Sequence, residues 1–189
     1  MADIDVVPTE FRNVEFTADQ IRGVVARLLV EAGLVDHPGI GSVRIEVDES
    51  TPLSKVVTQS LEPLVICAQS GALEDRRRTR HFGGDEAADA LGRAVFAAAD
   101  RLDPTFDGPA FDADVGVAHA VAWDCHVVGR MARLGHRPQR QRRLYSFELR
   151  HGFSDATVAA FDRLWSAERL TWAEIVAISD DARSVVGAA

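Results

Sequence analysis

Residues 16–33 read FTADQIRGVVARLLVEAG and carry the pattern of a helix that buries one face. Thr17 and Gln20 stand at the two positions of a capping box, with Phe16 and Ile21 as the flanking hydrophobic staple. Gly33 stands where a glycine commonly ends a helix. The apolar stripe comprises Ile21, Val24, Val25, Leu28, Leu29 and Ala32. The stretch therefore predicts a helix that covers an apolar layer.

Two strand patterns follow this helix and supply that layer. Val43, Ile45 and Val47 alternate with charged residues, as in a strand with one buried face. Residues 64–68 are continuously apolar and predict a central strand buried on both faces. Together these elements predict a small three- or four-stranded sheet covered by the N-terminal helix.

The other segments of the first half carry weaker patterns. Residues 11–16 predict a short strand and residues 73–82 a polar edge strand, in which arginines would discourage edge-to-edge pairing. Residues 1–8 predict a loose tail, and residues 49–60 fit no single element.

The second half is helical in pattern. The predicted helices cover residues 85–102, 114–134, 154–165 and 171–180, and residues 139–151 fit a helix better than a strand. Strands first and helices later indicate the α+β class. We expect a single globular domain over residues 9–189, with a sheet-containing part at about 9–102 and a helical part at about 114–182. The Pro- and Gly-containing residues 103–113 predict a linker between the two parts.

Composition narrows the class of protein. The chain has 189 residues and a formal net charge of −8, and 20 of its 21 basic residues are arginines. This arginine bias and the many Ala and Val residues are typical of a GC-rich bacterial genome. No apolar run is long enough for a membrane helix, and no signal peptide pattern opens the chain. Two cysteines within apolar segments fit a reducing compartment, so we expect a cytoplasmic protein with no membrane partner.

The charge is unevenly distributed along the chain. Residues 1–129 have a net charge of −11, residues 130–151 of +6 and residues 152–189 of −3. The basic window holds seven arginines against the single acidic residue Glu148. Such a patch can bind an anionic ligand or an acidic protein surface. The alternative is that these arginines stabilise helix ends or pair with the surplus carboxylates.

A stripe of cationic and aromatic residues leads into this window. Its spacing of three and four residues places the members on one side of a helix and its continuation. We predict a ligand-binding surface formed by His119, Trp123, His126, Arg130, Arg133, Arg137 and Arg140, together with Arg142, Arg143 and Arg150 of the basic window. The opposite side, from Ala118 to Ala132, has small apolar residues that can pack closely against another helix.

Metal and cofactor motifs are lacking. His119 and His126 are seven residues apart, which is about 10.5 Å along a helix axis and too far for one ion. Asp107, Asp112 and Asp114 lack the spacing of a calcium loop. No Gly-rich phosphate loop and no Gly-x-Ser-x-Gly elbow occurs. We therefore expect no metal and no cofactor.

Two short segments resemble parts of known families. Residues 89–93, Asp-Ala-Leu-Gly-Arg, resemble the helix in which metallopeptidases of the zincin class carry His-Glu-Leu-Gly-His, without its ligands or its general base. Residues 170–186 are similar to the first helix and turn of bacterial helix-turn-helix modules, but Asp180 and Asp181 replace the turn residues. Because two carboxylates there would face DNA phosphates, we expect no nucleic acid partner.

These observations favour a non-enzymatic binding or interaction module whose ligand surface includes the arginine stripe. A first alternative is a hydrolase or transferase that uses His119 or His126 as a base, with Asp114 or Asp124 nearby. A second alternative is a helical scaffold that forms homo-oligomers through Phe161, Trp165 and Trp172.

Overall fold

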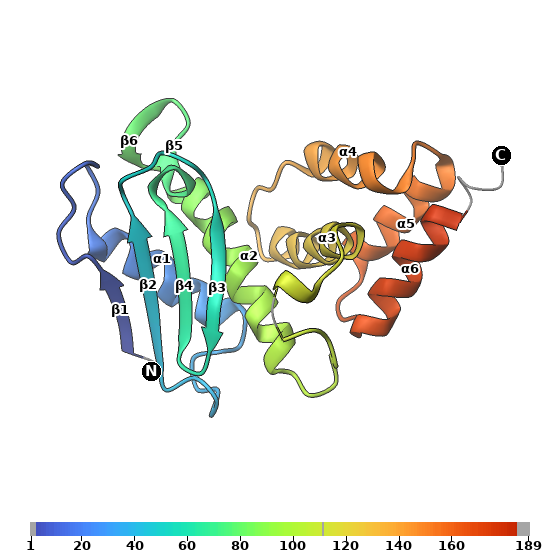
Figure 1. Cartoon of the computed structure of the whole chain (residues 1–189), viewed down its shortest axis with the longest axis horizontal. Helices are drawn as coiled ribbons and strands as arrows, with labels where there is room; N and C mark the ends of the chain where they lie inside the picture. The colour runs from blue at the N-terminus through green and yellow to red at the C-terminus, as the bar shows by residue number, and fades with distance from the viewer. Residues whose placement is uncertain (1–2, 111, 185–189) are drawn as a thin grey trace. The chain divides into compact units, whose positions relative to one another are not determined.

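The sheet lies in the first half of the chain and the helices of the second half form a separate bundle (Figure 1). The computed structural model describes residues 3–110 and 112–184. It divides the chain into two compact units, which we name the sheet unit (residues 1–102) and the helical unit (residues 103–189). The predicted α+β class is confirmed, since helices and a four-stranded sheet covered by an N-terminal helix are both present.

The sheet of the sheet unit has the strand order β1-β2-β4-β3. Strand β1 (Asp3–Val7) pairs parallel with β2 (Ser42–Asp48), which pairs parallel with β4 (Leu64–Gln69). Strand β3 (Val56–Leu61) pairs antiparallel with β4. Because Val43, Ile45 and Val47 alternate with more exposed residues, β2 buries one face as its pattern predicts.

Two helices pack on this sheet. Helix α1 (Ala18–Glu31) begins with the predicted capping box, since Thr17 and Gln20 exchange side-chain and backbone hydrogen bonds. Gly33 has a positive φ of 72°, a conformation that glycine adopts without strain. Helix α2 (Gly84–Leu102) contacts α1, β3 and β4. The core of the sheet unit therefore lies between the buried face of the sheet and these helices.

Four predictions for the sheet unit need correction. Residues 3–7 form strand β1 rather than a loose tail, because the alternating Ile4 and Val6 add a parallel edge to β2 and Val6 is buried. Residues 1–2 of that predicted tail lie outside the described residues. Residues 11–16 form no strand, since the amides of Arg12 and Asn13 donate to the Glu49 carboxylate instead of a ladder.

The other two corrections concern the middle of the sheet unit. Residues 74–82 form a separate hairpin of β5 (Glu74–Asp75) and β6 (Arg78–Phe82), not an edge of the main sheet. Strand β4 is central, as predicted, but Val65 and Cys67 on its second face are only half-buried. That face carries no second layer of helices in the sheet unit, whose helices α1 and α2 pack on the other side (Figure 1).

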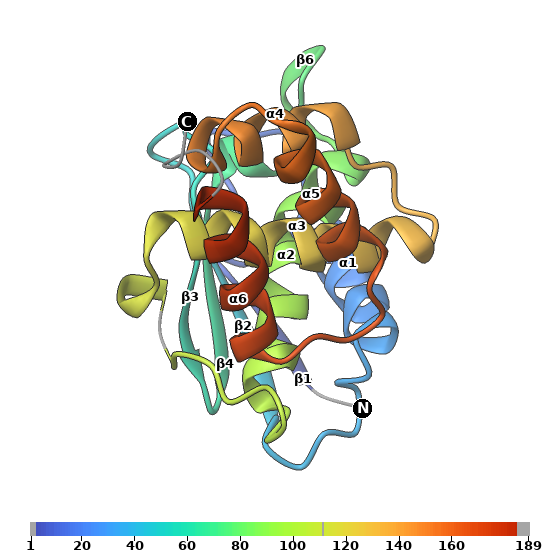
Figure 2. The same cartoon turned by 90° about the vertical axis from the view of Figure 1, so that its right-hand side faces the viewer.

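The helical unit surrounds one central helix. Helix α3 (Val117–Arg133) contacts α4 (Arg140–His151), α5 (Asp155–Ser166) and α6 (Trp172–Ser184), which Figure 2 shows around it. A Cβ on Gly129 would lie 2.2 Å from the carbonyl oxygen of Trp165, so α3 and α5 approach closely only because this residue is glycine. The predicted capping box of Thr171 and Glu174 begins α6.

The start of α3 and the burial of the linker differ from prediction. Helix α3 begins at Val117, with Gly116 as its N-cap, while residues 112–114 form a short 3-10 turn η2 (Asp112–Asp114). The predicted linker is partly buried: Phe106 packs against Trp123, and its carbonyl oxygen accepts a hydrogen bond from the Trp172 amide. Residue 111 of that linker lies outside the described residues. Among the described helices, none has both the length and the apolar character to cross a membrane.

Candidate functional site

The start of the predicted ligand stripe belongs to an aromatic cluster inside the helical unit. Trp123 is buried between Phe106 and Trp172, with ring centroids 5.2 and 5.7 Å away. His119 is half-buried with its ring edge-on to Trp172, and its Nε2 lies 2.9 Å from the Asp180 carboxylate. This part of the stripe therefore joins α3 to α6.

The next member, His126, is buried between α3 and α5. Its Nδ1 donates to the carbonyl oxygen of Leu164 at 3.2 Å. Its Nε2 is buried and has no hydrogen-bond partner among residues 3–110 and 112–184. Burial, reinforced by the nearby charge of Arg130, lowers the pKa of His126 to about 4. The imidazole is therefore neutral at pH 7 and lies out of reach of a ligand in solvent.

Arg133 binds the end of a neighbouring helix. Its guanidinium donates to the carbonyl oxygens of Trp165 at 2.6 Å and Ala167 at 2.5 Å, where α5 ends. The last carbonyls of a helix have no partner within the helix and carry the negative end of its dipole. Arg133 thus supplies both hydrogen bonds and charge to α5.

Arg140 is also engaged within the helical unit. It forms an ion pair with Asp162, and its guanidinium lies 5.1 Å from the ring centroid of Phe161 and 5.7 Å from that of Trp165. Nearby, Arg143 of α4 pairs with Asp124 of α3 at 3.1 Å. These arginines fasten α4 to α5 and to α3.

Three arginines of the basic window have no such role. Arg137, Arg142 and Arg150 are exposed, and within the described part of the chain no carboxylate or carbonyl group binds their guanidinium groups. Arg137 belongs to the predicted stripe; Arg142 and Arg150 lie on α4. The window therefore divides into arginines that hold the helices together and arginines that face solvent.

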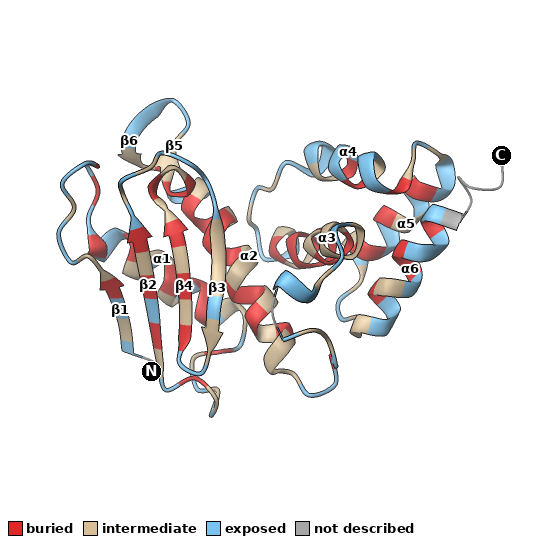
Figure 3. Ribbon diagram, in the orientation of Figure 1, coloured by how far each residue is buried: buried red, intermediate tan, exposed pale blue. Residues whose placement is uncertain are grey.

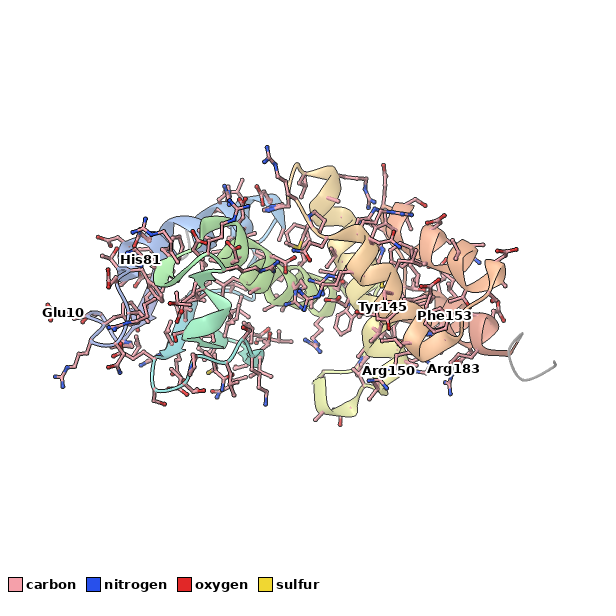
Figure 4. All side chains as sticks on the ribbon, turned by 90° about the horizontal axis from the view of Figure 1, so that it is seen from above. Glu10, His81, Tyr145, Arg150, Phe153 and Arg183 are labelled. Carbon is pink, nitrogen blue, oxygen red and sulfur yellow. The ribbon has the colours of Figure 1, made fainter. Side chains whose placement is uncertain are left out.

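The exposed arginines adjoin large apolar side chains that sequence reasoning missed. Tyr145, Leu149 and Phe153 are all exposed, and the rings of Tyr145 and Phe153 lie 6.0 Å apart. Figure 4 labels Tyr145, Arg150, Phe153 and Arg183 at one side of the helical unit. We name the set Arg142, Tyr145, Leu149, Arg150 and Phe153 the α4 surface. The helical phase of residues 140–151 could have revealed it, because Leu144, Phe147 and His151 occupy the opposite, buried side.

The groups of the enzyme alternative are not brought together. His119 Nε2 contacts the Asp180 carboxylate, His126 Nδ1 donates to the Leu164 carbonyl oxygen, and Asp124 pairs with Arg143. The side chains of the oligomer alternative also have partners within the helical unit: Phe161 is buried and stacks on Trp165, and Trp172 belongs to the aromatic cluster.

The two short resemblances are resolved by local geometry. In α2, Arg93 and Asp89 form an ion pair at 3.8 Å at the positions that would carry zincin ligands. Helix α6 continues through Asp180 and Asp181 to Ser184, so the described part of residues 170–186 has no turn there; residues 185–186 lie outside it.

A depression of the sheet unit is lined by residues of β1 to β4 and the connection before β3. Within it, the Cys67 thiol donates to the Glu46 carboxylate at 3.4 Å. Burial and this carboxylate raise the pKa of Cys67 to about 11, so the thiol stays protonated and is a poor nucleophile. No group of three His, Cys, Asp or Glu side chains is placed to hold a metal ion in the described residues.

Comparison of the chain with known protein families, curated proteins and solved structures finds no match.

Proposed function

We propose that the helical unit is a non-enzymatic binding module for an anionic ligand or an acidic protein surface. The proposal rests on the different situations of the arginines in the basic window. Arg133, Arg140 and Arg143 form internal contacts, whereas Arg137, Arg142 and Arg150 are exposed and have no side-chain partner among residues 3–110 and 112–184. An unpaired group of like charges repels itself and is stabilised when an anion binds.

The proposed binding surface keeps only three arginines of the predicted ligand surface, the exposed Arg137, Arg142 and Arg150. Of the stripe, Trp123 and His126 are buried, so they support the helical unit rather than meet a ligand. Arg137 lies in the connection between α3 and α4, and Arg142 and Arg150 add charge from α4. An acidic protein that still binds polyanions requires such a local concentration of positive charge.

We also propose that the protein acts in the cytoplasm of a bacterium. Cys67 and Cys125 form no disulfide, and burial raises the pKa of both thiols. Protonated, partly or fully buried thiols fit a reducing compartment. The bacterial origin rests on the arginine bias of the composition alone.

Heparin binding at increasing salt concentration tests the binding function. We expect the full chain, despite its net charge of −8, to bind heparin at low salt and to be released as salt screens the charges. The triple variant Arg137→Ala, Arg142→Ala, Arg150→Ala should bind about tenfold more weakly or worse, because three contacts are lost.

The control is a triple variant with the same change of charge in the sheet unit: Arg12→Ala, Arg77→Ala, Arg78→Ala. These arginines are also exposed, and their side chains make no ion pair in the described residues. We expect this variant to bind like the unmodified chain. Absence of binding at low salt, or equal loss in both variants, would contradict the proposed function.

A further inference from the structure

The α4 surface combines exposed apolar side chains with two arginines whose guanidinium groups have no ion-pair partner in the described part of the chain. Tyr145, Leu149 and Phe153 are 54%, 55% and 64% exposed. Arg142 precedes Tyr145 by one turn, and Arg150 follows Leu149 directly. Apolar side chains that cluster at the surface and are flanked by polar groups commonly mark a contact with another macromolecule.

Tyr145, Leu149 and Phe153 are exposed although α4 packs against the rest of the helical unit, because they lie on its other side. Helix α4 already buries Leu144, Phe147 and His151 against the rest of the helical unit. Tyr145 and Leu149 are four residues apart and project from the opposite side, where Figure 3 shows α4 largely exposed. Phe153, just beyond the helix, extends this side because its ring contacts Tyr145. Helix α4 thus has one apolar face that is buried in the helical unit and a second apolar face that is exposed.

A small inorganic anion or a polysaccharide would need the arginines but not this second face. Covering Tyr145, Leu149 and Phe153 removes apolar surface from water only if the ligand is itself apolar there. A second copy of the chain in a twofold contact would bring two copies of this positively charged surface together, which is unfavourable. The surface is complementary to a different partner with apolar and acidic groups side by side.

We propose that the ligand of the α4 surface is an acidic amphipathic helix of a partner protein. Its apolar stripe, at spacings of three and four residues, would cover Tyr145, Leu149 and Phe153, and its flanking carboxylates would pair with Arg142 and Arg150. This inference rests on the proposed anion-binding function and deepens it, since it specifies what kind of anionic partner the module takes.

Two synthetic peptides with the same Glu, Leu and Ala composition test the inference. One places the leucines on a single helical face, flanked by glutamates; the other distributes the same residues around the helix. Fluorescence anisotropy with the full chain should show at least tenfold tighter binding of the amphipathic peptide. In the variant Leu149→Ser, Phe153→Ser this preference should vanish while heparin binding stays unchanged. Both side chains are exposed, so the fold should tolerate the change.

The control variant is Val30→Ser, Leu53→Ser, which removes two exposed apolar side chains from the sheet unit and should keep the preference. Equal or absent binding of the two peptides, with heparin binding intact, overturns the inference and leaves the proposed function standing. The inference is also overturned if the chain binds phosphatidylserine vesicles more tightly than either peptide. It is likewise overturned if the chain forms a dimer that the substitution Phe153→Ser dissociates. If the unmodified chain does not bind heparin at low salt, the proposed function itself is overturned.

Discussion

His126 is a neutral imidazole inside a cluster of helices, and its burial has a thermodynamic consequence. Its pKa falls from 6.5 to about 4 on folding, chiefly through burial. His151 shifts in the same direction: it is buried, its Nδ1 donates to the Phe147 carbonyl and its Nε2 accepts from the Ser179 hydroxyl. At pH values below 6.5 the unfolded chain binds protons at these positions that the folded chain does not bind.

We therefore expect the helical unit to lose stability as the pH falls from 7.5 to 5. His126 alone should contribute about 2 kcal/mol to this loss. Urea unfolding followed by tryptophan fluorescence measures it, because Trp123, Trp165 and Trp172 all belong to the helical unit. The variant His126→Gln should show a smaller pH dependence than the unmodified chain, and the control His37→Gln an unchanged one. Equal pH dependence in all three proteins would show that His126 is solvated.

At the scale of single residues, the sequence predicts hydrogen bonds between near neighbours better than it predicts which side chains are buried. Both capping boxes, at Thr17 and at Thr171, are present because their hydrogen bonds involve residues three positions apart. The spacing of His119, Trp123 and His126 correctly places them on one side of a helix. It contains no information about α5 and α6, which cover that side, so a predicted ligand surface proves to be partly core.

Among the elements, α5 depends on a side chain from α3. Arg133 donates to two carbonyl oxygens at the end of α5, whereas Arg137, one turn further along the sequence, has no partner in the described residues. The two arginines therefore have different roles, although both fit the spacing of the predicted stripe. Arg133 stabilises a helix end, and Arg137 contributes to the proposed binding surface.

This difference predicts opposite effects of two equivalent substitutions. Arg133→Met should lower the free energy of unfolding by about 1 kcal/mol, since two hydrogen bonds and a helix-end charge are lost. It should leave heparin binding nearly unchanged. Arg137→Met should weaken heparin binding and change stability by less than about 0.5 kcal/mol. Urea unfolding and heparin titration of both variants check the result, and a reversal of the two patterns would refute the assignment.

The elements themselves could largely be predicted, and the exceptions have physical causes. Helices are recognisable because caps and periodicity are local, as in α1, α5 and α6. Strand β1 escaped prediction because five residues near a chain end form a strand only through pairing with β2, which is distant in sequence. The α4 surface was not predicted because the basic window was interpreted by its charge alone. The helical positions of Tyr145 and Leu149, which lie between its arginines, were not used.

At the scale of the whole molecule, the two units differ in composition as well as in fold. Each has a core of its own, with Ile45, Ile66 and Leu91 in the sheet unit and Phe147 and Phe161 in the helical unit. The sheet unit contains no tryptophan and no tyrosine, since all three tryptophans and Tyr145 follow residue 102. Tryptophan fluorescence therefore reports only the helical unit, while far-UV circular dichroism reports both.

Because each unit has its own core, we expect the isolated fragment 103–189 to fold without the sheet unit. Its urea midpoint by tryptophan fluorescence should match that of the full chain, and it should retain salt-dependent heparin binding. The circular dichroism transition of the full chain should then differ from its fluorescence transition, because two units unfold separately. If the fragment has the fluorescence of an unfolded chain, or the full chain shows coincident transitions, residues 9–189 fold as the single domain that the sequence predicts.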